Sequence, residues 1–180
     1  LEAKYFIELW FVLLSTKLAE VMKCDVAADK KAIEDKTLGY FFITVVICVL
    51  WCVSIPLWKP FMANVLQYSD VDKLVSLVLI LLGFYALYAF QNVFDATFYG
   101  LGKTHYMAFE SIATNGIYYV GAFILYITGV WVPTLTGIAL LFGIGMAFDS
   151  VVSFGAYWFL LKKNGWNLLR ISSEVNGVEQ

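Results

Sequence analysis

Two stretches of sequence decide the fold: LGYFFITVVICVLWCVSIPLW, residues 38–58, and LVSLVLILLGFYALYAFQNVF, residues 74–94. Each runs for 21 residues without a charged side chain. An apolar bilayer core about 30 Å thick is crossed by a helix of about 20 residues. Both stretches therefore predict transmembrane helices.

The composition of the whole chain also indicates a membrane protein. Of its 180 residues, 61% are hydrophobic and 14% are charged, whereas soluble domains average about 45–50% apolar and about 25% charged residues. A soluble core of this size could not bury so many apolar side chains, so much of the surface must face lipid. The net charge of −2 leaves no basic excess for phosphate backbones, so we expect no nucleic-acid partner.

Three further segments complete a prediction of five transmembrane helices in an all-α, polytopic membrane protein. The charge-free run 111–148 is too long for one crossing, and Thr128, Gly129 and Pro133 interrupt it with turn residues. Residues 5–22 are a weaker candidate because they include charges, and the alternative is an amphipathic helix on the membrane surface. The expected bundle, residues 1–170, has spans at 5–22, 38–58, 74–96, 107–129 and 134–161, followed by a disordered cytoplasmic tail at 171–180.

Lysine and arginine residues predict the orientation, because cytoplasmic loops are enriched in them. Eight lie on one side of the expected spans and three on the other. We therefore expect the chain in the plasma membrane, with three parts in the cytoplasm: the connection 23–36, the connection at Lys103 and the C-terminus. The connections 59–73 and 131–133 are expected outside the cell. If residues 5–22 span, the chain starts outside at Leu1 with an odd number of helices, which indicates the tail end of a longer protein.

Asp149 is the main functional candidate, because a charge inside a membrane span is costly. It lies 13 residues before Lys162, about 20 Å along a helix, and hence near the bilayer midplane. Ala139, Gly143 and Ala147 recur every four positions and predict a stripe for close helix packing. Asp149 lies off that stripe, so we expect it to face a cavity as a protonatable or cation-binding carboxylate. A structural hydrogen-bonding role is the alternative.

A second polar group lies near the expected cytoplasmic end of the span 74–96. Gln91, Asn92 and Asp95 fall within five residues, and Gln91 and Asp95 are one helical turn apart on the same face. Their oxygens could bind a hydrophilic solute or a cation, or could merely reach the headgroup layer. Glu110 is expected at the interface, and Asn115, deeper in the same span, could continue a polar track.

Other kinds of chemistry are not indicated. The sequence GLGKT, residues 100–104, ends like a phosphate-binding loop, but Thr97 stands where the first glycine of that motif is required. The single histidine, His105, has no nucleophile at a suggestive spacing, and the three cysteines have neither CxxC nor zinc spacing. We therefore expect no enzyme activity, no metal centre and no cofactor other than Na⁺ or H⁺ as a coupling ion.

Three fragments together resemble a known family: QNVFDATFYGLGKTHYM at 91–107, Asn-x-x-Tyr-Tyr at 115–119 and GVWVPTLTGIAL at 129–140. They are similar to the multidrug and toxic compound extrusion (MATE) transporters and to the wider superfamily that includes polysaccharide and lipid-linked oligosaccharide flippases. The resemblance covers about 15–163 and implies helices 8 to 12 of a twelve-helix fold, an incomplete six-helix lobe whose N-terminal partner lobe is missing. Bacterial efflux members carry a coupling acid about a turn before the residue that matches Gln91. Tyr88 stands near that place here.

The leading functional hypothesis is a secondary transporter that exports amphipathic or cationic solutes, such as drugs, in exchange for Na⁺ or H⁺. Its partners would be the lipid bilayer, the missing lobe and a small-molecule solute. A flippase for lipid-linked sugars is an alternative, but the acidic polar residues favour an organic cation over a pyrophosphate. A small membrane subunit or assembly factor is the alternative from another class.

The orientation can be tested by cysteine labelling in intact cells after the native cysteines are replaced. A membrane-impermeant thiol reagent should modify Val132→Cys, which is expected outside, and should not modify Lys163→Cys, which is expected inside. The opposite pattern of labelling would contradict the assignment of sides from the lysine and arginine count.

Overall fold

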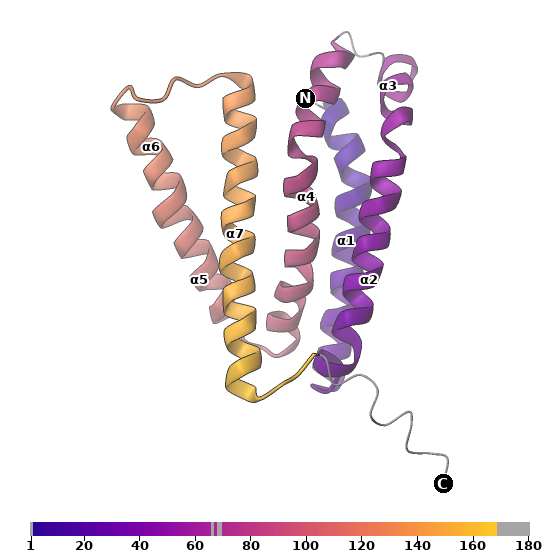
Figure 1. The fold of residues 1–180 in the computed structure, drawn as a ribbon, viewed down its shortest axis with the longest axis vertical. Coiled ribbons are helices and arrows are strands. Elements are labelled where there is room, and N and C mark those ends of the chain that lie inside the picture. Colours follow the sequence, from indigo (N-terminus) through magenta and orange to yellow (C-terminus); the bar gives the residue numbers. More distant parts are fainter. Residues whose placement is uncertain (1, 66, 68–69, 169–180) are drawn as a thin grey trace.

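A computed structural model describes residues 2–65, 67 and 70–168 as a bundle of helices, without a strand in those residues (Figure 1). The tail 171–180 therefore lies outside the described residues. The elements in chain order are α1 (Glu2–Ala28), α2 (Ala32–Val53), α3 (Ile55–Asn64), α4 (Val71–Gly100), α5 (His105–Ala113), the π-helix η1 (Thr114–Tyr119), α6 (Val120–Ile127) and α7 (Leu135–Asn164). The all-α prediction is confirmed.

Three of these helices, α2, α4 and α7, are long and apolar enough to cross a membrane. This finding confirms the membrane-like helical character that the composition predicted. Figure 1 shows the connections 29–31 and 101–104 at the same end of the bundle as the end of α7, whereas the connection 128–134 lies at the opposite end. The long elements therefore alternate in direction along the chain.

The second expected span, 38–58, differs from the observed helix. The helix α2 begins earlier, at Ala32, and ends at Val53, and α3 follows after a turn at Ser54. Pro56 in the first turn of α3 accounts for the break, because proline has no N–H to donate and disfavours helical backbone before it. The Ser54 hydroxyl fixes the turn, since Oγ donates to the carbonyl of Trp51 over 2.6 Å and accepts from Trp58 Nε1 over 2.8 Å.

The helix α4 is the centre of the bundle. It packs against α1, α2 and α7, and Figure 1 shows it between α7 and the pair α1 and α2. One buried cluster surrounds Tyr85 of α4 and includes Phe11 of α1 stacked on Trp51 of α2, with ring centroids 4.3 Å apart. A second cluster surrounds Phe98 of α4 and includes Tyr157 of α7. In lipid such contacts stabilise the fold through close packing, because lipid tails are as apolar as these side chains.

The end of the bundle that holds the connection 29–31 is fastened by polar contacts. Asp25 of α1 accepts hydrogen bonds from Lys36 Nζ over 2.9 Å and from the Tyr40 hydroxyl over 2.7 Å. These two donors lower the pKa of Asp25 below its usual value. After α7, the backbone N–H of Asn167 donates to the Glu34 carboxylate over 2.8 Å, so the chain crosses back to the start of α2.

Gly100, the last residue of α4, allows a close crossing with α1. A Cβ atom added at Gly100 would lie 2.7 Å from Val26 Cβ and 2.8 Å from the carbonyl oxygen of Lys23. The carbonyl belongs to the backbone of α1 and cannot turn away, so any side chain here would force the two helices apart.

We therefore expect Gly100→Ala to destabilise the bundle by about 1–3 kcal/mol, the usual cost of overpacking. Gly83→Ala in the same helix is the matched control, because nothing lies within 4 Å of its added Cβ. Alanine should be neutral or slightly stabilising there through its helix propensity. Denaturant unfolding in detergent would measure both variants, and equal stability of the two would contradict the close crossing.

Candidate functional site

Asp149 of α7 connects three helices through its carboxylate. One oxygen, Oδ2, accepts a hydrogen bond from Gln91 Nε2 of α4 over 2.7 Å. The other oxygen, Oδ1, accepts from the Thr114 hydroxyl, at the start of η1, over 2.6 Å. A charged group away from water is tolerable only when such partners are present. The half-buried Asp149 is thus held by one donor on each oxygen.

A serine on α7 fixes the amide of Gln91. The Ser150 hydroxyl lies 2.9 Å from Gln91 Oε1 and donates to it, which directs the Nε2 donor toward Asp149. Both Gln91 and Ser150 are buried, with 3% and 7% of their surfaces exposed. Gln91 therefore lies in a polar contact between α4 and α7.

Asp95 and Glu110 extend this polar region along the same helices. Asp95 lies one turn after Gln91 and accepts a hydrogen bond from Ser153 of α7 over 3.1 Å. Glu110 of α5 is only 3% exposed, and its Oε1 has no hydrogen-bond partner in the described part of the chain. The charges of Asp95, Glu110 and Asp149 act on one another. We call these three residues the acidic triad.

Glu110 is buried between helices, while its expected place at the membrane interface stays a prediction. Glu110, Ala113 and Thr114 are all buried and share one face of the helix, because residues three and four apart lie above one another. That face packs on α7. A small residue and a threonine follow Glu110 at helical spacing, which is a short signal for this face, whereas the expected interfacial position was based on the closeness of Glu110 to the end of the span.

Two other predicted residues lie at the margin of the site. Asn92 faces α1 instead, where its Nδ2 donates to the Ser15 hydroxyl over 2.7 Å. Asn115 is exposed, and its Nδ2 donates to the carbonyl of Ser111 over 2.8 Å. Sequence reasoning did not select the residues that complete the site, Thr114, Ser150 and Ser153, because single hydroxyls within apolar helices carry no pattern that indicates their partners.

Two cavities lie beside the acidic triad. One of about 410 Å³ is lined by Asp149, Gln91, Thr114, Asn115 and Tyr119, among others. The other, of about 380 Å³, is lined by Asp95 and Asn92 of α4 and by Glu20 and Lys23 of α1, among others. Tyr88 lines both cavities and so lies between them. The triad therefore offers a carboxylate to each of two neighbouring spaces.

Glycines on α7 bring the helices close enough for these contacts. A Cβ at Gly143 would lie 2.4 Å from the ring of Phe84 on α4, and a Cβ at Gly145 would lie 2.5 Å from the Tyr119 hydroxyl of η1. Ala139 also packs against the cluster around Tyr85. The predicted stripe of Ala139, Gly143 and Ala147 thus includes two residues at the contact with α4, while Ala147 is half-buried.

Comparisons with protein-family models, with curated proteins and with solved structures find no match. In the described residues, no three His, Cys, Asp or Glu side chains are arranged to hold a metal ion.

Removing the amide of Gln91 tests the hydrogen-bond network. We expect Gln91→Met, which keeps the length of the side chain, to cost about 1–3 kcal/mol of stability, because it removes one of the two donors to the half-buried Asp149 carboxylate. In an Asp149→Leu background the same change should cost much less, since position 149 no longer carries the carboxylate that Gln91 pairs with. Unfolding in detergent of the four proteins of this double-mutant cycle measures the coupling, and additive effects would contradict the network.

Proposed function

We propose that the chain is part of a cation-coupled secondary transporter of the MATE type that exports amphipathic or cationic solutes across the plasma membrane. The observation that carries this proposal is the acidic triad. Two of its carboxyl groups, Asp149 of α7 and Asp95 of α4, each line one of two cavities that share Tyr88, and the charge of Glu110 on α5 interacts with both. Ionisable residues within membrane helices are characteristic of substrate and ion pathways.

The proposal places five helices across the bilayer: α1, α2, α4, the combined α5–η1–α6, and α7. The alternation of direction along the chain supports five crossings. Large apolar side chains on the outer faces support it as well, among them Phe42 of α2, Ile112 of α5 and Val151 of α7, each about 70% exposed. Water would disfavour these faces, whereas lipid tails would cover them. The C-terminus is then cytoplasmic, as the lysine and arginine count predicts.

The hydrogen bonding of the triad supports a coupling role. Both oxygens of Asp149 are paired, but among the described residues the buried Oε1 of Glu110 has no hydrogen-bond partner. Three carboxylates in a medium of low dielectric repel one another strongly. A proton or a monovalent cation that enters the triad relieves this repulsion and satisfies the free oxygen. When the ion leaves, the repulsion returns. The free energy of the triad therefore differs between the ion-bound and the ion-free state, and a coupled transporter needs such a difference.

The charges around the cavities support a cationic solute. Carboxylates of Asp149, Asp95 and Glu20 line the two cavities, and Lys23 is the one basic side chain among their lining residues. A site of this sign attracts an organic cation and repels the pyrophosphate of a lipid-linked sugar. The geometry therefore favours export of a cation over the flippase alternative.

Neutral substitutions in the intact protein test the coupling role. We expect Asp149→Asn to leave expression and insertion unchanged, to lower coupled export several-fold and to flatten its dependence on pH or Na⁺, because an amide cannot release a proton or neutralise a cation. Asp95→Asn should have a smaller effect. Export of a fluorescent cation from proteoliposomes, with an imposed proton or sodium gradient, measures both.

Asp72→Asn is the control, because Asp72 is on α4 as Asp95 is, but lies outside the triad, exposed and paired with Lys59. It should behave as the wild type does. Wild-type export with unchanged ion dependence in the Asp149→Asn protein would contradict the coupling role and leave Asp149 as a structural hydrogen-bond acceptor.

A further inference from the structure

The π-helix η1 interrupts an otherwise α-helical segment between α5 and α6. Its wider turn is marked by the hydrogen bond from the backbone N–H of Val120 to the carbonyl of Asn115, five residues earlier. Short π segments within α-helices are rare, and those that occur are often found at functional sites. In this chain the π-helix begins at Thr114, the residue that donates to Asp149.

The π geometry brings several side chains of η1 onto α7. Thr114 donates to Asp149, and the hydroxyl of Tyr119 lies against Gly145. In an α-helix, residues five apart would be about 140° apart around the axis, since each residue turns about 100°. The wider turn places both on the side that faces α7. The Tyr118 hydroxyl adds a hydrogen bond to the carbonyl of Leu141 over 2.7 Å.

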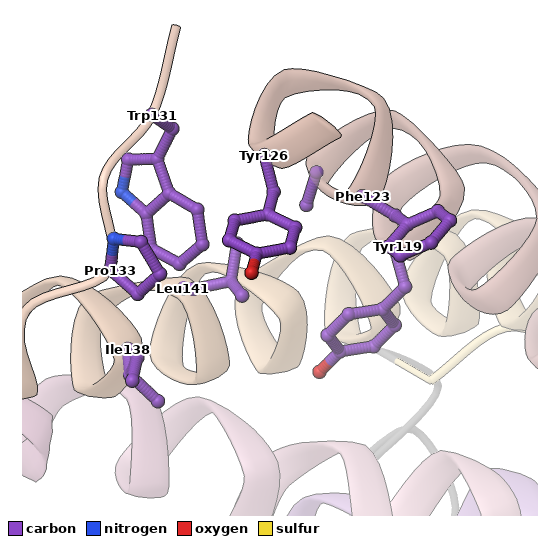
Figure 2. A pocket seen from close by; sticks show the side chains of 8 residues that line it. Tyr119, Phe123, Tyr126, Trp131, Pro133, Ile138 and Leu141 are labelled. Atoms are coloured by element: carbon purple, nitrogen blue, oxygen red, sulfur yellow. The ribbon is translucent and has the colours of Figure 1, made fainter. Parts of the chain in front are cut away.

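After η1, the helix α6 packs only loosely against the rest of the bundle. The helix α6 has no buried residue, and Figure 1 shows it leaning away from α7 toward the connection 128–134. A cavity of about 330 Å³ separates the two helices, and Figure 2 shows aromatic rings along it. Its lining residues include Tyr119, Phe123, Tyr126, Trp131 and Leu141.

We propose that η1 is a hinge that responds to the occupancy of the acidic triad, with Thr114 as the positioning residue. This inference rests on the proposed coupling function. When a proton or cation binds Asp149, the carboxylate is a poorer acceptor and the hydroxyl of Thr114 is released. The π turn then relaxes toward α-helical geometry, α6 rotates by up to about 100° relative to α5, and Tyr119 withdraws from Gly145. The outer end of α6 closes on α7 and the cavity between them shrinks.

Several titratable groups lie close enough to interact with the charge of Asp149. They are Tyr88 and Asp95 from α4, Glu110 from α5 and Tyr119 from η1. Val12 of α1, which is apolar, lines the cavity beside Asp149. A pH titration therefore reports on the group as a whole, and variants of Thr114 are needed to isolate the hinge.

Spin labels on exposed residues at the outer ends can measure the motion. We choose Ile127→Cys at the end of α6 and Leu57→Cys on α3, which are 65% and 68% exposed, with Cys24, Cys48 and Cys52 replaced. In the chain reconstituted in lipid nanodiscs, lower pH or added Na⁺ should shift the distance between the labels to smaller values. The shift should reach several ångströms, because rotation carries a side chain around a helix about 10 Å wide.

Variants of Thr114 separate the hinge from a merely structural contact. Thr114→Val keeps the shape but removes the donor, so the short distance should dominate under all conditions. Thr114→Ser keeps the donor and should restore the wild-type response. Tyr118→Phe is the control, because it removes a hydrogen bond between η1 and α7 that does not involve Asp149, and its response to ions should persist.

The hinge is overturned if the wild-type distance responds to neither pH nor Na⁺, or if Thr114→Val responds as the wild type does. Export assays on the same samples keep the two proposals apart. Loss of coupled export in Asp149→Asn together with a wild-type distance that does not respond to ions would overturn the hinge alone. A distance that responds to ions in a protein whose export is independent of them would overturn the coupling function alone.

Discussion

The carboxylate of Asp149 is the constraint on which the arrangement of the helices depends. In a bilayer an unpaired charge costs at least about 2.5–3.5 kcal/mol on insertion scales. Gln91 and Thr114 each supply a donor, and they belong to different helices. Pairing Asp149 therefore requires α7 to lie between α4 and η1 at one height. Apolar packing alone would tolerate a shift of α7 along its axis, whereas two short hydrogen bonds do not.

Small residues make this pairing possible. Gly143 admits the ring of Phe84 and Gly145 admits the hydroxyl of Tyr119, so α7 approaches α4 and η1 on two different faces. Larger residues would hold the backbones apart and lengthen the hydrogen bonds of Asp149. The polar contacts thus depend on the glycines, because close packing of the helices determines the geometry of the charged group.

The sequence predicted the features that depend on composition along one helix. The expected span 134–161 is close to α7, Leu135–Asn164, and Asp149 was recognisable as a costly charge in an apolar run. Features that depend on how helices face each other were missed. The burial of Glu110 and the donor from Thr114 depend on contacts with α7, and the donor from Ser150 depends on the contact of α7 with α4. The break at Ser54 precedes Pro56, which lies within the expected span 38–58.

Gln91 and Asn92 give α4 a mechanical role. These neighbours project about 100° apart around the helix, and one bonds to Asp149 of α7 while the other bonds to Ser15 of α1. A rotation of α4 that preserves one bond must strain the other. A rotation of α4 about its own axis would therefore be felt by both α1 and α7.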